Sequence, residues 1–441
     1  MPSCFFSCNS WVFLIRNDSP PGIYTTFAPK KKTRFMEYTT HTLANGLRMV
    51  HLPSESPVAY CGFAVNAGAR DEQPSEYGLA HFVEHMIFKG TERHRANYIL
   101  NRMETVGGEL NAYTTKEETF VYSLFMREHF QRAFDLLVDL VFHSTFPEVQ
   151  IAKETDVIRD EISSYEDSPS ELIFDDFENL LFQGHALGHN ILGDENCLSA
   201  FGPESGRSFM RRFYTPDNMV FFSMGNIPFG KIVKWAEGLM SDIPASANRL
   251  SRQKPGPVVT ESRLLSKDTH QAHVMIGSRA YSMFDDRRIS LFLLNNILGG
   301  PGMNNRLNLS LREHNGLVYN VESNLASYTD TGVFSVYFGT DPKNRKRAMN
   351  LVHRELDKFR AEKLSERQLE AAKKQALGQL GVSVDNRESL FLNLGKSFLH
   401  YNRFDSMDEV FEQIQEVTAE SIWQVANELF DPDRLFTLMY D

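Results

Sequence analysis

The chain has 441 residues, a formal net charge of −11 and a hydrophobic content of 42%, a composition typical of globular proteins. Its length exceeds one ordinary domain and predicts two or three domains with sizeable cores. No apolar run approaches the roughly 18 residues that a membrane-spanning helix needs, so no membrane span is expected. The acidic balance argues against a nucleic-acid partner. Four scattered cysteines are too few for a disulfide framework, which favours a reducing compartment and predicts a cytoplasmic location.

Residues 1–35 differ in character from the rest of the chain. Their apolar stretch comes before their basic residues, which is the reverse of a secretory signal. One interpretation is a disordered leader, or a true start at Met36. The alternative is a mitochondrial transit peptide, because Asp18 is the only acidic residue, and this would place the protein in the mitochondrial matrix. Without these residues, which carry five basic side chains and one acidic, the net charge falls from −11 to −15.

From Tyr38 onward the pattern becomes regular. Asn45-Gly46 predicts a hairpin turn between two strands within residues 42–50, and residues 58–65 predict a further strand. The next elements, in chain order, are expected to be a helix at 78–88, a helix at 99–106, strands at 110–115 and 119–124, and helices at 130–142 and 147–165.

The helix expected at 78–88 carries two histidines and a glutamate. His81 and His85 are four residues apart and so lie on one helix face, which Glu84 shares. An imidazole pair suits zinc, and a third ligand with one open position is the arrangement of a zinc hydrolase. Glu84 would then accept a proton from the attacking water. The order His-x-x-Glu-His is the inverzincin motif. Without a metal, these polar groups would be costly to bury among the apolar residues of the same helix.

A third ligand is expected on the helix at 147–165. Glu154 and Glu161 are seven residues apart, so both lie on one face of this helix, two turns apart. Spacing alone does not choose between them. The alternative is that either glutamate is a solvated residue paired with Lys153 or Arg159.

The second part of the chain repeats the first. Three pairs of segments match: 148–151 with 366–369 and 168–172 with 386–390, both at an offset of 218, and 88–90 with 298–300 at an offset of 210. Residues 242–258 are rich in helix and strand breakers and read as a linker. The predicted fold is therefore α+β, with two tandem homologous domains, each an antiparallel-rich β-sheet packed with α-helices. The expected boundaries are 36–241 for a catalytic zinc-binding domain and 259–441 for its homologue.

The second repeat lacks the candidate metal site. The positions of His81, Glu84, His85, Glu154 and Glu161 correspond to Leu291, Leu294, Asn295, Ala372 and Gln379. Loss of both carboxylates together with both histidines is what a shared site predicts. Only the first half is expected to bind metal.

These motifs together resemble the pitrilysin/insulinase family of zinc metallopeptidases, and in size its processing-peptidase branch. The resemblance covers essentially residue 37 to the C-terminus. It rests on four features: Gly-Ala-Arg-Asp-Glu at 68–72, the motif at 81–85 with Phe-Lys-Gly-Thr at 88–91, Gly-Gly-Glu-Leu-Asn-Ala-Tyr-Thr at 107–114, and Glu161, 76 residues after His85.

The resemblance also implies roles for individual residues. His81, His85 and Glu161 would hold one zinc ion per chain, Glu84 would be the base, and Glu154 would be a carboxylate that orients the ligands. Two further residues, Asn111 and Ala112, would lie on an edge strand to which the backbone of a peptide substrate adds.

Arg312 and Tyr319 resemble an arginine and tyrosine pair with which the family's inactive half holds substrate and the polarised carbonyl. A guanidinium and a phenol are suitable donors to a peptide oxygen that gains charge. The alternative is an ordinary exposed arginine and a packed tyrosine. The glycine-rich segment 299–302 is expected to be a turn.

The expected function is that of a zinc-dependent endopeptidase acting on short unstructured peptides or presequences. The resemblance further implies a homodimer or a heterodimer with a related subunit. One alternative is a non-catalytic or regulatory subunit of such a complex, but the four intact residues His81, Glu84, His85 and Glu161 argue against it. A second alternative is another metallohydrolase on a similar fold, against which Arg312 and Tyr319 argue because both are suited to holding an extended peptide chain.

Overall fold

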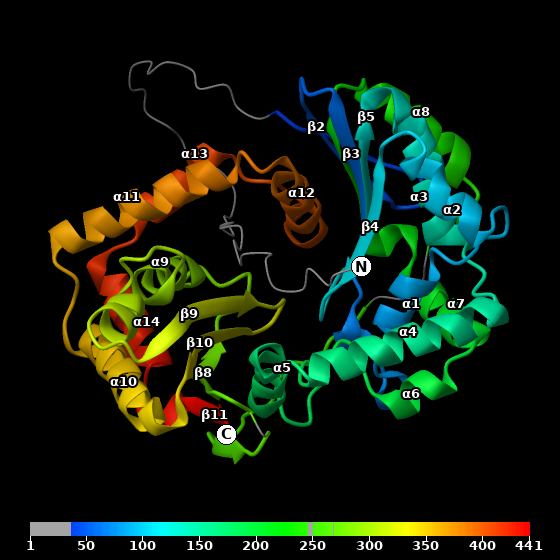
Figure 1. The fold of residues 1–441 in the computed structure, drawn as a ribbon. Coiled ribbons are helices and arrows are strands. Elements are labelled where there is room, and N and C mark those ends of the chain that lie inside the picture. Colours follow the sequence, from blue (N-terminus) through cyan, green and yellow to red (C-terminus); the bar gives the residue numbers. More distant parts are fainter. Residues whose placement is uncertain (1–36, 246–249, 268) are drawn as a thin grey trace, which may run out of the picture.

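The computed structural model describes residues 37–245, 250–267 and 269–441, so the expectations for residues 1–35 lie outside the described residues. The described chain forms two halves, each built on one mixed β-sheet covered by helices (Figure 1). The predicted α+β class with two tandem units of one fold is confirmed. Over these ranges, every helix is too short or too polar to cross a membrane.

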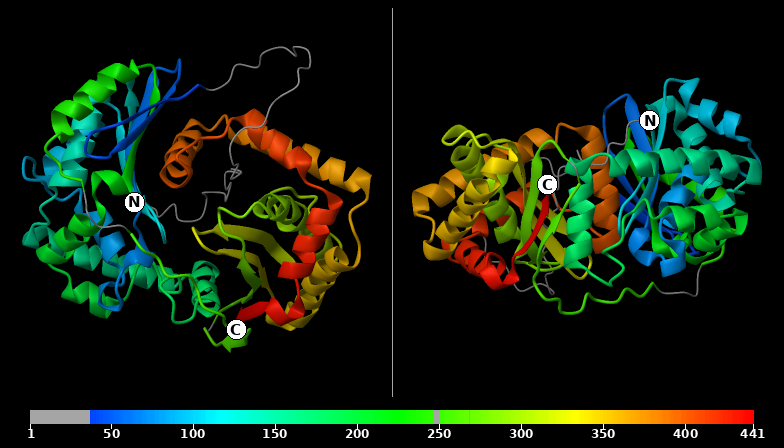
Figure 2. Two further views of the ribbon diagram at one scale, coloured as in Figure 1. Left: turned by 180° about the vertical axis from the view of Figure 1, so that it is seen from behind. Right: turned by 60° about the horizontal axis from the view of Figure 1, so that its bottom comes forward.

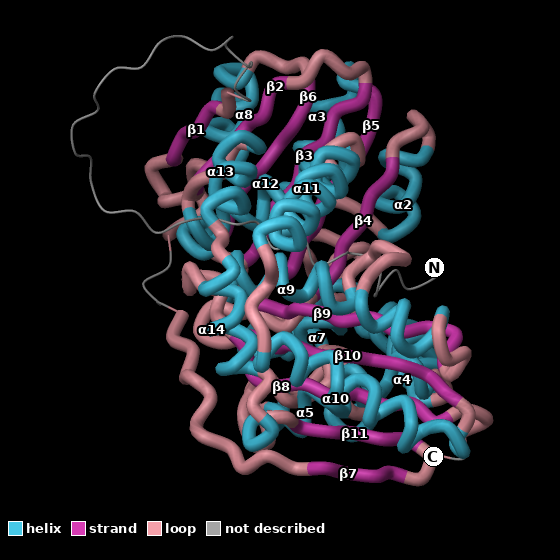
Figure 3. The backbone as a smooth tube through the Cα atoms, turned by 90° about the vertical axis from the view of Figure 1, so that its left-hand side faces the viewer, coloured by secondary structure: helices cyan, strands magenta, loops and turns pink. Residues whose placement is uncertain are grey.

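The first sheet has the strand order β1-β2-β6-β3-β5-β4 (Figure 3), in which β2 and β6 are parallel and all other neighbours are antiparallel. Its strands are β1 (Thr39–Thr42), β2 (Arg48–Pro53), β3 (Val58–Val65), β4 (Glu109–Thr114), β5 (Thr119–Met126) and β6 (Met219–Gly225). The predicted Asn-Gly turn joins β1 to β2, where the N–H of Gly46 donates to the carbonyl of Leu43. β3 and β6 are buried almost throughout, which explains their continuous apolar sequences.

In the described chain, seven helices cover the first half: α1 (Leu79–Met86), α2 (Ala96–Glu104), α3 (Phe130–His143), α4 (Glu148–Glu166), α6 (Glu195–Ala200), α7 (Pro203–Phe213) and α8 (Phe229–Met240). Of these, α1, α2, α3 and α4 correspond to the four predicted helices, with α2 starting and ending earlier than expected, and the other three were not predicted. Short helical turns lie at η1 (Ala69–Asp71), η2 (Pro74–Glu76), η3 (Arg127–His129) and η4 (Pro216–Asn218). α1, α2 and α3 pack against one face of this sheet and enclose the largest apolar core of the half.

The second sheet has the order β7-β11-β8-β10-β9, which repeats the order β2-β6-β3-β5-β4 with its parallel pair in the same place. Its strands are β7 (Ser262–Leu265), β8 (Ala272–Ala280), β9 (Val318–Ser327), β10 (Gly332–Thr340) and β11 (Phe436–Tyr440). The helical elements are α9 (Arg288–Gly299), η5 (Asn308–Glu313, a π-helix), η6 (Pro342–Asn344), α10 (Arg345–Ala361), α11 (Glu366–Ser383), α13 (Met407–Glu416), α14 (Ala419–Leu429) and η7 (Pro432–Arg434). This identical order supports the internal repeat.

Two helices cross between the halves. α5 (Pro169–Leu181) packs on β8 and β11 of the second sheet, whereas α12 (Arg387–Tyr401) packs on β3 and β6 of the first. Both helices lie between the two halves, with α12 above α5 in the view of Figure 1, and Figure 2 shows the same arrangement from behind. Both helices start at positions 218 residues apart, so they are equivalent elements of the repeat. Each sheet is thus covered on its second face by the other half, and apolar clusters hold the halves together.

The predicted domain limits, 36–241 and 259–441, stay a prediction. Each half has its own sheet, but α5 packs on the sheet of the second half and α12 packs on the sheet of the first. The described part of the predicted linker 242–258 is held against the first half by side-chain contacts. Arg252 is nearly buried there and ion-pairs with Asp71 at 2.7 Å.

We expect Phe391→Ala to detach α12 from the first sheet. The Phe391 side chain is fully buried and stacks on Phe222 with ring centroids 4.4 Å apart. Gly395 permits this approach, because a Cβ there would lie 2.8 Å from the Phe222 ring. The truncation should lower the free energy of unfolding by about 3–5 kcal/mol, measured by denaturant titration. The matched control Val382→Ala, on the exposed part of α11, should change it by less than about 0.5 kcal/mol; equal losses would contradict the packing assigned to α12.

Candidate active site

The site begins with the local structure of α1. Gly78 precedes the helix with a φ of 93°, a left-handed conformation that favours glycine. The Glu72 carboxylate then accepts hydrogen bonds from the N–H groups of Gly78, at 2.9 Å, and Ala80, at 2.7 Å. A carboxylate at a helix N-terminus satisfies free donors and interacts favourably with the helix dipole. The start of α1 is therefore fixed from a residue outside the helix.

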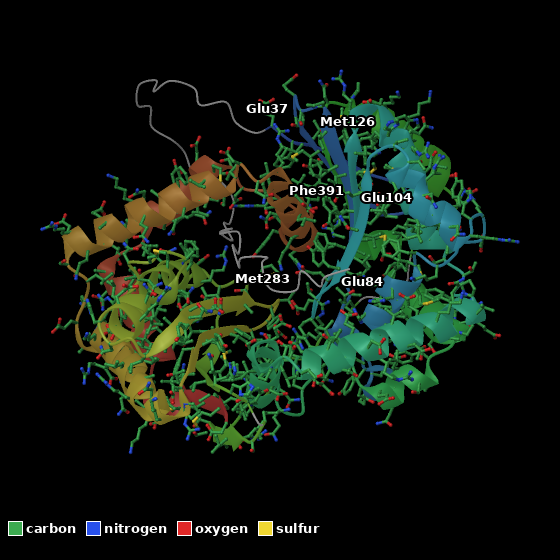
Figure 4. The ribbon with its side chains drawn as sticks, in the orientation of Figure 1. Glu37, Glu84, Glu104, Met126, Met283 and Phe391 are labelled. Carbon is green, nitrogen blue, oxygen red and sulfur yellow. The ribbon has the colours of Figure 1, made fainter. Side chains whose placement is uncertain are left out.

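α1 and α4 bring three potential ligands together. The Glu161 carboxylate Oε2 lies 3.7 Å from Nε2 of His81 and 3.4 Å from Nε2 of His85. One ligand atom from each of the three residues lies within 4.8 Å of the others. Figure 4 places Glu84 on α1, beside the end of β4. The spacing-based expectation of one shared helix face is thus met by the geometry of these side chains.

Glu154 occupies a different place from Glu161. Its Oε1 lies 3.0 Å from Nδ1 of His85, on the side of the ring away from Glu161. Its Oε2 pairs with Nζ of Lys89 at 2.7 Å. Once Nε2 of His85 gives up its proton, Nδ1–H can still donate to Glu154, and Nε2 is then available as the ligand atom. Glu154 thus contacts Nδ1 of His85 and Glu161 faces Nε2 of the same ring, and their roles as orienting carboxylate and ligand stay a prediction.

The site's environment sets distinct pKa values for its groups. Burial lowers the pKa of His81 to about 3, helped by the neighbouring His85, so this imidazole is neutral at pH 7. Burial raises the pKa of Glu84 to about 6, although Thr114 at the end of β4 acts to lower it. Burial also acts to lower the pKa of His85, but hydrogen bonds to Glu154 and Glu161 outweigh it and raise that pKa to about 9.

These residues fit a zinc ion. Two imidazoles and one carboxylate form the protein ligand set of a catalytic zinc site, with a fourth position open. Among the described residues, Oε2 of Glu84 is buried without a hydrogen-bond partner, as expected for a group that faces a reacting water. A carboxylate whose pKa lies near 6 is suited to proton transfer near neutrality.

Asn111 and Ala112 lie on β4, which is the edge strand of the first sheet. β4 pairs with β5 on one side, and in the described sheet its other side has no neighbour. α1 packs directly against β4, so this open edge passes the helix that carries His81 and His85. An extended peptide could add to it as a further strand.

Arg312 and Tyr319 lie in the other half of the molecule. Arg312 belongs to the π-helical turn η5, and its side chain is half exposed, with Glu313 as an ion-pair neighbour at 3.9 Å. Tyr319 lies on β9, the edge strand of the second sheet, and is 85% exposed. The structure gathers the five residues of α1 and α4 but leaves this pair in the second half, on η5 and β9. In the glycine-rich segment 299–302, which was expected to be a turn, Gly299 is the last residue of α9 and residues 300–302 form a bend after it.

The equivalent positions of the second half make neutral contacts. Nδ2 of Asn295 donates to the carbonyl of Ser323 at 3.1 Å, and Nδ2 of Asn296 donates to Oε1 of Gln379 at 2.8 Å. α9 and α11 pack against each other as α1 and α4 do, but the site residues are replaced by the amides Asn295 and Gln379 and by the apolar Leu291, Leu294 and Ala372.

Sequence reasoning missed three residues of this site: Lys89, Glu72 and Thr114. Lys89 follows His85 by four residues, so helical spacing could have pointed to it. Nothing in the local sequence indicated that Glu72 caps α1 or that Thr114 reaches Glu84, because both contacts depend on how separate elements pack.

Comparisons with known proteins place these features in one family. Residues 49–195 match the family described as insulinase (peptidase family M16), and residues 201–376 match the M16 inactive domain. The chain is also 34% identical over 401 residues to YmxG of Bacillus subtilis, an uncharacterized zinc protease, covering 90% of this chain and 97% of that protein. The chain belongs to the M16 peptidase family. The family resemblance seen in the motifs is therefore confirmed.

Other M16 relatives agree over similar lengths. An uncharacterized zinc protease of Streptomyces coelicolor is 32% identical over 398 residues, which are 88% of this chain and 86% of that protein. Solved structures share the fold. A protease from Helicobacter pylori has a TM-score of 0.83 at 19% identity and covers 92% of this chain and 99% of its own. A Pseudomonas fluorescens peptidase M16 inactive domain has a TM-score of 0.85 at 18% identity, with 92% and 97% covered.

The positions of the two carboxylates on α4 lead to a prediction. We expect Glu161→Gln to abolish most zinc binding, because its carboxylate faces both histidines. Glu154→Gln and Lys89→Met should weaken zinc binding by about 10–100-fold, because both disturb only the orientation of His85. Zinc titration against a chelator of known affinity measures all three. If Glu154→Gln loses the metal and Glu161→Gln keeps it, the two roles are reversed.

Proposed function

We propose that this M16 family member is a zinc-dependent endopeptidase that holds one zinc ion per chain and hydrolyses short unstructured peptides or presequences. The observation that carries the proposal is the convergence of His81, His85 and Glu161, with the buried carboxylate oxygen Oε2 of Glu84 beside them at the end of an open edge strand. The names of the bacterial relatives as zinc proteases support it.

In this proposal, the residues of the site have separate roles in the reaction. His81, His85 and Glu161 would hold the zinc, which when bound activates water and polarises the substrate carbonyl. Glu84 accepts the proton of the attacking water at its free carboxylate oxygen and passes it to the leaving amine. Glu154, held by Lys89, keeps His85 oriented.

The edge strand β4 supplies the substrate site in this proposal. Backbone groups at Asn111 and Ala112 would pair with an extended substrate, so recognition depends on backbone more than on side chains. This mode excludes folded proteins and favours short flexible chains. Arg312 and Tyr319 would donate to substrate oxygens from the second half, for which their exposure leaves them available.

Pairing with a second copy or a related subunit, and a cytoplasmic location, stay predictions from the sequence. The alternative of a non-catalytic subunit is disfavoured, because a scaffold has no need for the full set of His81, Glu84, His85 and Glu161.

The test is zinc content and cleavage of a mixed peptide library by the purified chain, with mass spectrometry of the products. The expected result is about one zinc per chain and cleavage within peptides that stops on chelation. Stoichiometric zinc without cleavage of any library member would favour the non-catalytic alternative.

A further inference from the structure

Three consecutive residues before the metal helix each contact a different part of the molecule. Arg70, Asp71 and Glu72, here called the link segment, are all nearly buried. The backbone of η1 fixes the segment to the turn after β4, where the N–H groups of Ala69 and Arg70 donate to the carbonyls of residues 115 and 116. Because the three link residues are consecutive in this fixed backbone, we expect a displacement of one to displace the other two.

Arg70 contacts the second half. Its guanidinium donates to both carboxylate oxygens of Asp330, at 2.8 and 2.6 Å, in the turn between β9 and β10. It also donates to Glu117 at 2.6 Å, whose carboxylate in turn accepts hydrogen bonds from the N–H and hydroxyl of Thr329. The Arg70 side chain is 1% exposed, so removal of a partner leaves a buried charge poorly compensated.

Asp71 contacts the segment that connects the halves. It accepts two hydrogen bonds from Arg252, at 2.9 and 2.7 Å, and one from the N–H of Gly68 at 3.0 Å. The carbonyl of Gln253, the next residue, accepts a hydrogen bond from Arg70. The link segment therefore contacts both the connecting segment and the turn between β9 and β10 of the second half.

Glu72 contacts the metal helix. Its two hydrogen bonds to the N–H groups of Gly78 and Ala80 fix the first turn of α1, one residue before His81. His189 approaches the same carboxylate at 2.9 Å and stacks on Tyr77, so Glu72 cannot move without disturbing a packed cluster.

We propose that the link segment makes the position of the metal helix depend on the docking of the second half, so that Asp330 and Glu72 are positioning residues for the zinc ligands. This rests on the proposed function for its consequence in zinc binding, but the mechanical coupling is a property of the chain itself. Asp330 acts through Arg70 and Glu72.

Two alanine variants that each remove a carboxylate between the halves test this coupling. Asp330→Ala breaks the contact to Arg70. The control, Glu388→Ala, breaks the contact between α12 and the hydroxyl of Tyr122, at 2.8 Å, which does not involve the link segment. Hydrogen–deuterium exchange of the metal-free protein is followed in peptides that span residues 78–86. Should Asp330→Ala fail to fold, Asp330→Asn replaces it.

We expect exchange in α1 to be at least about fivefold faster in Asp330→Ala and unchanged in Glu388→Ala. The visible absorption of the cobalt-loaded protein, which reports ligand geometry, should change in Asp330→Ala alone, and its zinc affinity should fall by about tenfold. Unchanged exchange in α1, or equal acceleration in both variants, overturns the coupling. A wild-type chain that binds neither zinc nor cobalt refutes the proposed function separately, and the exchange comparison then still decides the coupling.

Discussion

Glu84→Gln should keep its zinc and lose nearly all of its peptidase turnover. Glu84 is not one of the three residues whose ligand atoms converge, so the amide leaves the ligand set intact. The amide cannot accept a proton, however, and general-base steps contribute roughly 100- to 10,000-fold to rates. Turnover should therefore fall at least about 100-fold while peptide binding persists.

The measurement is zinc by atomic absorption and cleavage of a quenched peptide, made on the same preparation. Glu166→Gln, at the C-terminal end of α4 and exposed, is the matched control and should behave as the wild type. If Glu84→Gln turns over normally with zinc bound, the base is a different group.

His81→Ala and His85→Ala should lose zinc and activity together. Each removes one of two imidazoles from a three-ligand set, and His85 additionally holds Glu154 through Nδ1. The repeat supplies a matched control, because Asn295 occupies the position of His85 on α9. Asn295→Ala should keep about one zinc per chain, since the second half has no ligand set to lose.

Chelation of the wild type should reproduce the histidine variants, and zinc added back should restore the wild type alone. Retention of stoichiometric zinc by His85→Ala would show that the metal binds elsewhere in the chain.

Local sequence pattern determined much of this fold. Spacing of four residues places His81 and His85 on one helix face whatever the helix packs against, because the α-helical period is fixed. The strand at 58–65 and the helix at 130–142 follow from apolar pattern, and the structure has them at Val58–Val65 and Phe130–His143. The internal offsets likewise predicted two units of one fold, which the identical strand orders bear out.

Tertiary structure decided what periodicity leaves open. Glu154 and Glu161 share one face of α4, so only the packing of α4 on α1 places Glu161 opposite both Nε2 atoms and Glu154 at Nδ1. The apolar faces of α5 and α12 indicate that each helix is buried, but they do not indicate which sheet each helix packs against. Their exchange depends on contacts between elements more than 90 positions apart in the sequence, and local pattern does not encode such pairings.

The sequence by itself therefore determined the metal helix, the repeat and the family, because these depend on residues close together or on motifs read in order. Only the tertiary structure decided that Glu72 caps α1 and that Arg70 reaches Asp330, 260 residues away. The physical reason is that a buried ion pair is specified by the positions of both partners, and those positions exist only once the two halves have packed.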